Sequence, residues 1–208
     1  MEYPIIRRIL FPIIGLWIKK IEGTENIPRK GAFIIAANHS SYLDHYFLIY
    51  VVVPLLDKKL HFLAKKEHFN SLVERAWHTH GGAIPLDREK GGKEALGLAV
   101  KALREGKIIG IYPEGTRSLT GKLQKAKTGA ARLAIKSGVP ILPVGLTGTF
   151  RILPKGKHIP KMKRAAIKIG RPIYLGHHNK KINKRTLRLA TTRIMKEIAK
   201  LCGQEYDF

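Results

Sequence analysis

The sequence predicts a single α/β domain with a mixed, largely parallel β-sheet flanked by helices. Short apolar runs alternate along the chain with longer segments whose apolar residues recur at helical spacing, which is typical of strands joined by helical crossovers. A length of 208 residues and a hydrophobic content of 44% fit one domain with a sizeable core. The single cysteine, Cys202, allows no internal disulfide and indicates a reducing compartment.

Six apolar runs are predicted to be strands. The first covers residues 31–37, has the continuous apolar character of a buried strand, and ends in the small residues Ala36 and Ala37. The other predicted strands cover residues 60–64, 83–86, 108–112, 140–146 and 165–169.

Five segments are predicted to be helices. Residues 46–56 form a long apolar helix that carries Asp44 at its N-terminal end, where the helix dipole favours an ionised carboxylate. Residues 93–104 repeat apolar side chains at helical spacing and are followed by Gly106. The other helices are predicted over residues 71–80, 128–136 and 184–201, and residues 151–164 are predicted to be a basic loop within the domain.

Residues 1–20 are predicted to form an N-terminal membrane-interface segment, with the main domain over residues 21–208. An apolar run over residues 9–18 has arginines before it and lysines after it. This run is about half of the ~20 residues that a membrane-spanning helix needs. Cations at both ends, with Trp17 near one edge, favour an amphipathic helix lying at the membrane interface. A core helix with charged ends is the alternative.

The charge balance limits the classes of partner. Lys and Arg number 39 against 15 Asp and Glu, which gives a formal charge of +24 and predicts attraction to nucleic acid, anionic lipid or phosphorylated substrates. No zinc-ligand spacing, RNP-like strand or helix-turn-helix stands out, so a basic nucleic-acid-binding protein is the alternative rather than the leading hypothesis. No metal site is expected, because the paired histidines at 78, 80, 177 and 178 lack further ligands at useful spacing.

A histidine and an aspartate follow the first predicted strand. His39 and Asp44 are separated by four residues at a strand-to-helix junction, a common location for reactive groups in α/β proteins. Histidine can accept a proton near neutral pH, and a carboxylate on its other nitrogen fixes the tautomer. The pattern predicts His39 as a general base oriented by Asp44. The alternative is a histidine that merely caps the helix.

A second polar segment, residues 112–118, follows the predicted strand 108–112. Gly115 permits a sharp turn, and the planar guanidinium of Arg117 suits bidentate contact with a phosphate. Glu114 is predicted to orient Arg117 or to accept a hydrogen bond from a polyol. A structural turn with a surface salt bridge is the alternative. A phosphate-binding P-loop is excluded, because Leu123 replaces the Ser or Thr that this motif requires.

Four motifs occur in order along the chain. They are Asn38-His39-x4-Asp44, residues 82–88 (GAIPLDR), residues 113–118 (PEGTRS) and residues 139–144 (VPILPV). Together they resemble the four blocks of the glycerolipid acyltransferases, and most closely those of the 1-acylglycerol-3-phosphate O-acyltransferase branch. The resemblance extends over residues 21–172. The chain departs from the family pattern at Ala126, where relatives usually carry an aromatic residue before the lysine that corresponds to Lys127.

The resemblance implies that His39 takes the proton of a lysophosphatidate hydroxyl as its oxygen attacks an acyl thioester, giving phosphatidic acid, and that Asp44 holds His39. Backbone N–H groups near His39 are candidates for stabilising the oxyanion. The other implied site residues are Arg88, Glu114, Gly115, Thr116, Arg117 and Lys127 for the acceptor, and Pro140 and Pro143 for the acyl donor or for packing.

The expected co-substrate is acyl-CoA or acyl carrier protein, with no cofactor. The expected partner is an anionic membrane surface, because each nearby cation contributes ~1 kcal/mol to adsorption. These properties imply a peripheral protein at the cytoplasmic face of the cell membrane. Acylation of glycerol-3-phosphate or of another lysophospholipid is the alternative within the family.

Overall fold

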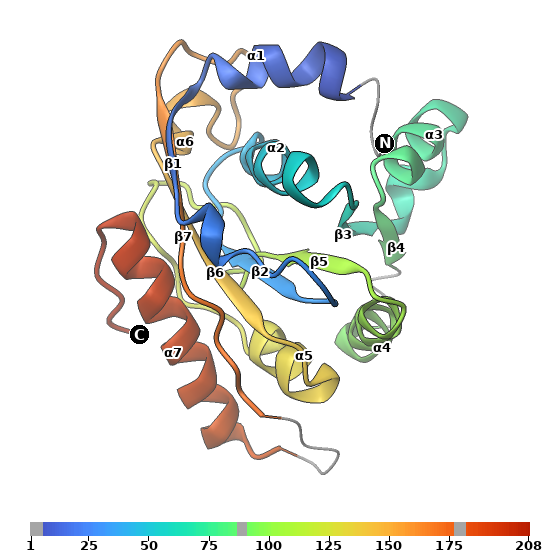
Figure 1. The fold of residues 1–208 in the computed structure, drawn as a ribbon, viewed down its shortest axis with the longest axis vertical. Coiled ribbons are helices and arrows are strands. Elements are labelled where there is room, and N and C mark those ends of the chain that lie inside the picture. Colours follow the sequence, from blue (N-terminus) through green and yellow to red (C-terminus); the bar gives the residue numbers. More distant parts are fainter. Residues whose placement is uncertain (1–5, 87–90, 177–181) are drawn as a thin grey trace.

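A seven-stranded sheet forms the centre of the computed structural model, which describes residues 6–86, 91–176 and 182–208 (Figure 1). The strands are β1 Ile18–Glu22, β2 Ile34–Ala37, β3 Leu60–Lys65, β4 Ile84–Leu86, β5 Ile108–Ile111, β6 Ile141–Thr147 and β7 Ala165–Ile169. Their order is β1-β7-β6-β2-β5-β3-β4. All neighbouring strands run parallel except β6 and β7, which confirms the predicted mixed, largely parallel sheet.

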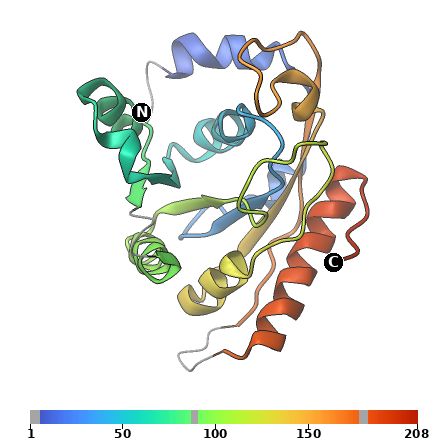
Figure 2. The ribbon, with the colours of Figure 1, turned by 180° about the vertical axis from the view of Figure 1, so that it is seen from behind.

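Helices cover both faces of this sheet (Figures 1 and 2). The longer ones are α2 Asp44–Leu56, α3 Leu72–His80, α4 Gly91–Arg104, α5 Gly129–Ser137 and α7 Lys184–Cys202. The shorter ones are η1 Ile6–Leu10, α1 Phe11–Gly15, η2 Thr24–Asn26, η3 Lys66–Phe69 and α6 Thr149–Ile152. All the predicted long helices and strands are found, while β1 and α6 were not predicted. No helix within the described ranges is long and apolar enough to cross a bilayer.

The alternation of side chains along β2 separates two cores. Ile35 and Ala37 pack with α2 on one face, whereas Ile34 and Ala36 pack with α4, α5 and α7 on the other. Successive residues of a strand point to opposite faces, so a strand buried on both faces is apolar at every position. All four residues of β2 are completely buried, which explains the continuous apolar run in the sequence.

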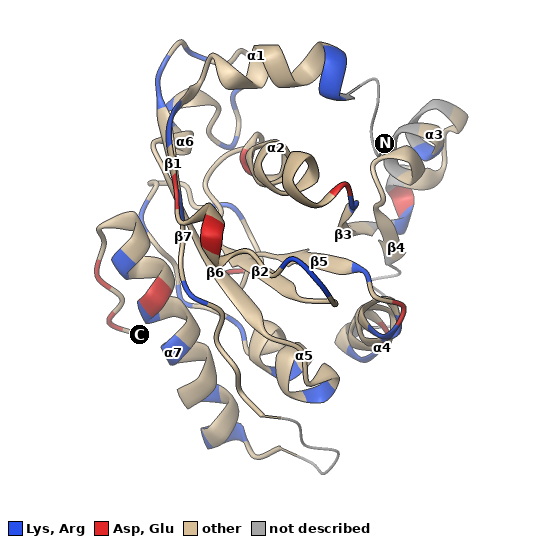
Figure 3. Cartoon of the chain, viewed as in Figure 1, with Lys and Arg blue, Asp and Glu red and all other residues tan. Residues whose placement is uncertain are grey.

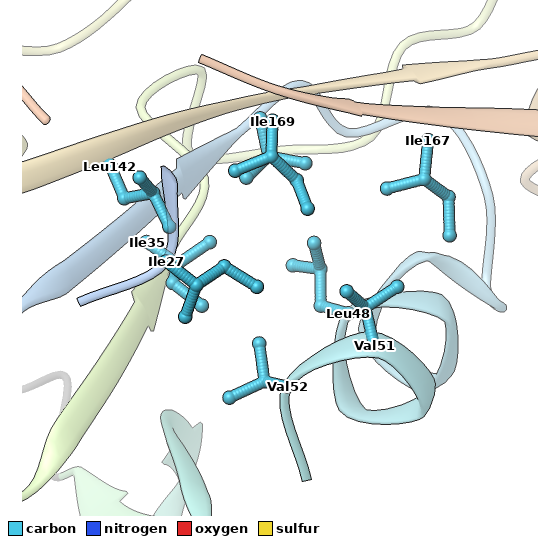
Figure 4. Close-up of a pocket in the computed structure, with 9 residues that line it drawn as sticks. Ile27, Ile35, Leu48, Val51, Val52, Leu142, Ile167 and Ile169 are labelled. Carbon is cyan, nitrogen blue, oxygen red and sulfur yellow. The ribbon is translucent and has the colours of Figure 1, made fainter. Parts of the chain in front are cut away.

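The α2 side of the sheet contains a small cavity with a volume of about 10 Å³ (Figure 4). Its lining is aliphatic: Ile27, Ile35, Leu48, Val51, Val52, Leu142, Val144, Ile167 and Ile169. A space of this size corresponds to about one water molecule, and an apolar lining offers water no hydrogen bonds. The cavity is therefore a packing defect of the core and not a ligand site.

The N-terminal segment differs from the single interfacial helix predicted over residues 1–20. Helical turns cover Ile6–Gly15, but Ile18–Glu22 forms β1 and pairs in parallel with β7. Ile18 and Ile21 pack against the core, and the two lysines between them are exposed, as is common in edge strands. The last residues of the predicted segment therefore belong to the sheet.

Candidate active site

Three loops meet at the carboxyl edge of the sheet because the parallel strands β5, β2 and β6 lie side by side. The central loop follows β2 and carries His39. The loop after β5 holds it on one side: Ser118 donates its N–H to the His39 carbonyl at 2.8 Å. The segment after β6 holds it on the other side, where Thr149 Oγ1 lies 3.0 Å from Ser40 Oγ. The local turn that begins α2 is thus fixed by elements far away in sequence.

His39 and Asp44 form the pair that the sequence predicts. His39 Nδ1 lies 2.8 Å from Asp44 Oδ2, and the Asp44 side chain is completely buried. The same oxygen accepts the backbone N–H groups of Ser40 at 2.7 Å and Ser41 at 2.8 Å. These donors, together with the N-terminus of α2, hold the Asp44 carboxylate in place. An ionised carboxylate only accepts hydrogen bonds, so Nδ1 carries the ring proton and Nε2 keeps a free lone pair.

The predicted oxyanion donors near His39 are already in use. Asp44 takes the N–H groups of Ser40 and Ser41, and the N–H of His39 itself donates to Glu114 Oε1 at 2.8 Å. These three N–H groups are therefore engaged within the protein, and the stabilisation of an oxyanion by backbone groups of this segment stays a prediction. The hydroxyls of both serines are also engaged, with Thr149 and with the Leu153 carbonyl, so neither is poised as a nucleophile.

An aromatic ring covers one face of the imidazole. The Tyr112 ring stacks on His39 with a centroid distance of 3.9 Å and an interplanar angle of 10°. Phe62 lies parallel to Tyr112 at 5.8 Å. Burial, with a further contribution from the charge of Asp44, raises the pKa of Tyr112 well above its usual value, so the phenol stays protonated. Among the described residues, Tyr112 OH and Asp44 Oδ1 are buried without a hydrogen-bond partner.

Glu114 acts within the protein and does not point to solvent. Its side chain accepts from the His39 N–H, and its other oxygen accepts from the backbone and side-chain N–H groups of Gln124 at 3.0 and 3.1 Å. Burial raises the pKa of this carboxyl, and the hydrogen bonds oppose that rise. Oε1 thus joins the β5 loop to the β2 loop, and Oε2 joins two parts of the β5 loop itself, rather than orienting Arg117 as predicted.

Two cationic side chains lie on the exposed side of the β5 loop. The Arg117 guanidinium carbon is 3.5 Å from the centroid of the Tyr42 ring, a cation–π contact that places it beside the His39–Asp44 turn. The Lys127 side chain packs over Gly115. A Cβ atom added to Gly115 would lie 3.2–3.5 Å from the end of the Lys127 aliphatic chain and its Nζ. Gly115 has φ +73°, which confirms the sharp turn. Thr116, the residue after Gly115, is exposed.

Two of the remaining predicted site residues, Pro140 and Pro143, belong to β6 or its approach. Arg88 lies outside the described residues. Pro140 precedes β6 at the opposite edge of the sheet, because Ile34 pairs with Ile141 while Ala37, next to the site loop, pairs with Val144. Pro143 is buried inside β6. Their surroundings favour the packing alternative.

Some residues of the site were not singled out from the sequence. Tyr42 and Tyr112 both lie inside or next to a motif, but their ring contacts depend on which loops the sheet brings together. Thr149 and Leu153 carry no local sequence signal, since they contact the His39–Asp44 turn from more than a hundred residues away.

Comparison with known proteins agrees with the motif pattern. The family model described as Acyltransferase matches residues 19–147. The 1-acyl-sn-glycerol-3-phosphate acyltransferase of Bacillus subtilis (strain 168) is 32% identical over 155 residues, which cover 74% of this chain and 73% of that protein. The protein of the same name from Borreliella burgdorferi (strain ATCC 35210 / DSM 4680 / CIP 102532 / B31) is 35% identical, and the match covers 65% of this chain and 55% of that protein.

A solved structure has the same fold. The crystal structure of the 1-acyl-sn-glycerophosphate (LPA) acyltransferase, PlsC, from Thermotoga maritima matches with a TM-score of 0.68 and 27% identity. The match covers 93% of this chain and 76% of that chain. The similarity therefore includes the sheet, its flanking helices and the loops at its carboxyl edge.

Proposed function

Because the chain belongs to the acyltransferase family, we propose that it transfers an acyl group from a thioester to the free hydroxyl of 1-acyl-glycerol-3-phosphate, giving phosphatidic acid. One observation carries the proposal. The bond between His39 Nδ1 and the buried Asp44 carboxylate leaves Nε2 as a base, next to a loop with two cations for a phosphate. A general base beside a phosphate-binding surface suits an acceptor with both a hydroxyl and a phosphate.

The reaction needs one base and no acyl-enzyme. His39 Nε2 accepts the hydroxyl proton while the alkoxide oxygen forms a bond to the thioester carbonyl carbon. The tetrahedral intermediate collapses, the carbon–sulfur bond breaks, and the imidazolium returns the proton to the leaving thiolate. Asp44 stabilises the imidazolium between these steps, because its carboxylate is already bonded to Nδ1.

Arg117 and Lys127 are proposed to bind the acceptor phosphate, together with Arg88 and with the backbone at Gly115 and Thr116. Arg117 is held over Tyr42, so its planar fork is pre-organised for two phosphate oxygens. Glu114 contributes by holding the His39 backbone against this loop.

The acyl donor is proposed to be acyl-CoA or acylated acyl carrier protein. The protein is proposed to act at the cytoplasmic face of the membrane. Three large apolar side chains of the N-terminal turns are exposed: Ile9, Ile13 and Leu16, at 59%, 45% and 56%. Apolar side chains of this kind next to cations suit the lipid headgroup boundary. The formal charge of +24 supports adsorption to an anionic surface.

The test is thioester consumption with lysophosphatidate in detergent–lipid micelles, using both carriers. We expect His39→Ala and Asp44→Asn to lower kcat by about 10²–10⁴-fold, the usual contribution of general-base catalysis. Asp57→Asn is the matched control, because Asp57 lies at the other end of α2. Thermal unfolding verifies that each variant is folded.

Each contrary result removes a defined part of the proposal. Activity retained in His39→Ala would remove the base. Wild-type activity with glycerol-3-phosphate but not lysophosphatidate would change the acceptor. No turnover with any acceptor, together with tight binding to duplex DNA, would favour the nucleic-acid alternative.

A further inference from the structure

The loop that joins α6 to β7, residues 153–164, combines exposed apolar and basic side chains. Ile159 and Met162 are 82% and 72% exposed. Single exposed apolar residues are ordinary, but here they alternate with cations. The exposed basic residues of the loop are Lys155, Lys157, Lys161, Lys163 and Arg164.

Acidic residues are absent around this loop in the sequence. No Asp or Glu occurs between Glu114 and Glu197, so nothing in this part of the chain neutralises the loop locally. Figure 3 shows the basic residues in blue along this loop, above β7. A cationic loop with two exposed apolar side chains matches a surface that is anionic outside and apolar beneath.

The loop is attached to the N-terminal segment. Trp17 Nε1 donates to the Lys161 carbonyl at 3.0 Å, and the Ala165 N–H donates to the Trp17 carbonyl at 2.7 Å. Both views of the fold place the loop and α1 at the same end of the molecule (Figures 1 and 2). The exposed apolar residues of the N-terminal turns and those of the loop therefore occur at one end.

The other end of the loop is attached to the catalytic turn. The Leu153 carbonyl accepts the Ser41 hydroxyl at 2.9 Å and the Tyr42 N–H at 3.1 Å. Tyr42 is the residue on which Arg117 rests. A surface that residues 153–164 contact would thus lie next to the loops that carry the proposed base and the proposed phosphate-binding residues.

We propose that residues 153–164 are a lipid-contact element that inserts Ile159 and Met162 into an anionic bilayer and binds lipid phosphates through its lysines. An acceptor lipid can then reach His39 from the bilayer without crossing water; this last step rests on the proposed function. A lipid surface fits better than a nucleic acid, because the loop has no Phe, Tyr or Trp on which bases could stack.

Co-sedimentation of the full chain with vesicles tests the loop without turnover. The vesicles contain phosphatidylcholine alone or mixed with phosphatidylglycerol. We expect the double variant Ile159→Ser/Met162→Ser to bind mixed vesicles about tenfold or more weakly than wild type, because two buried side chains are lost. The control is Leu72→Ser/Leu189→Ser, which removes side chains that are 80% and 63% exposed on α3 and α7.

A second variant tests the charge. Lys157→Gln/Lys161→Gln should weaken binding to mixed vesicles and make it less dependent on salt, while leaving the weak binding to phosphatidylcholine unchanged. Wild-type-like binding by both double variants would overturn the proposal, as would equal loss in the control.

Turnover separates this inference from the proposed function. With vesicle-embedded lysophosphatidate, the Ile159/Met162 variant should lose activity in parallel with binding, but it should match wild type with a short-chain, water-soluble acceptor. Vesicle binding that depends on the loop, without turnover of any acceptor, would support the lipid contact and overturn the acyltransferase proposal.

Discussion

At the scale of single residues, His39 is held by two different contacts, a hydrogen bond and a ring stack. The Asp44 carboxylate bonds Nδ1 of the imidazole, while the Tyr112 ring stacks on the face of the imidazole with a centroid distance of 3.9 Å. An aromatic face attracts a cation, so in the proposed reaction the Tyr112 ring would stabilise the imidazolium intermediate. We therefore regard Tyr112 as a positioning residue for His39.

Replacing Tyr112 by Leu should lower kcat by on the order of tenfold with little change in KM, because a cation–π contact contributes about 0.5–2 kcal/mol. Tyr112→Phe should restore most of the activity, since it keeps the ring and removes a buried hydroxyl that has no partner among the described residues. Steady-state kinetics on both variants measures this. Equal losses in both would show that the hydroxyl, not the stack, is required.

Cys202 should be inert in the folded protein. The thiol is buried, donates to Asn38 Oδ1 at 3.3 Å, and burial raises its pKa from 9.0 to about 12. Between pH 9.0 and about pH 12, the Cys202 thiol therefore stays protonated in the folded state, whereas it loses its proton in the unfolded state. The resulting stabilisation is fully present below pH 9 and is lost as pH rises through 12.

Alkylation at pH 8.5 to 9 is expected to be slow for the native protein and fast after unfolding in urea, because only the thiolate reacts. The Cys202→Ala variant provides the unlabelled control. Rapid labelling under native conditions would show that α7 opens far more easily than its buried contacts suggest.

At the scale of elements, the C-terminal tail after α7 holds the β5 loop. Tyr206 OH accepts the Ala126 N–H at 3.0 Å, and Gln204 Oε1 accepts the Leu123 N–H at 2.9 Å. Ala126 is 2% exposed and belongs to the same core cluster as Tyr206. The small side chain at 126, where relatives usually carry an aromatic residue, thus has an aromatic ring from the tail as its neighbour.

We expect Tyr206→Phe to raise KM for the acceptor several-fold with a smaller effect on kcat. The change leaves the buried Ala126 N–H without an acceptor, at a cost of about 1–3 kcal/mol, and Lys127 is the next residue. Steady-state kinetics with varied acceptor concentration at saturating thioester measure the effects on KM and on kcat separately. Asp207→Asn is the control, because Asp207 is an exposed residue of the same tail. An unchanged KM would show that the C-terminal tail does not influence acceptor binding.

Locally encoded elements were predictable and long-range ones were not. α2 and β2 have continuous apolar character, and the His39–Asp44 pair is separated by so few residues that one turn brings it together. By contrast, β1 has a polar sequence, and its partner β7 lies about 145 residues further along the chain. The Tyr112 stack and the Tyr206 bond likewise depend on sheet order, which no local pattern encodes.

At the scale of the whole molecule, one excess of charge has two opposite consequences. A formal charge of +24 on 208 residues makes the folded state repel itself, because folding brings like charges together. The same charge attracts anionic lipid. Salt weakens both interactions, so it should stabilise the fold and weaken membrane binding at the same time.

Raising salt from about 0.01 M to about 0.1 M shortens the Debye length from about 30 Å to about 10 Å. We expect Tm to rise by on the order of 3 °C, since each kcal/mol corresponds to about 2–4 °C in a chain of this size. Binding to mixed anionic vesicles should fall over the same range, measured by co-sedimentation. Phosphatidylcholine vesicles are the control, with little salt dependence. If salt lowered Tm, attractive surface ion pairs would outweigh repulsion, and the net charge would not limit the stability of this fold.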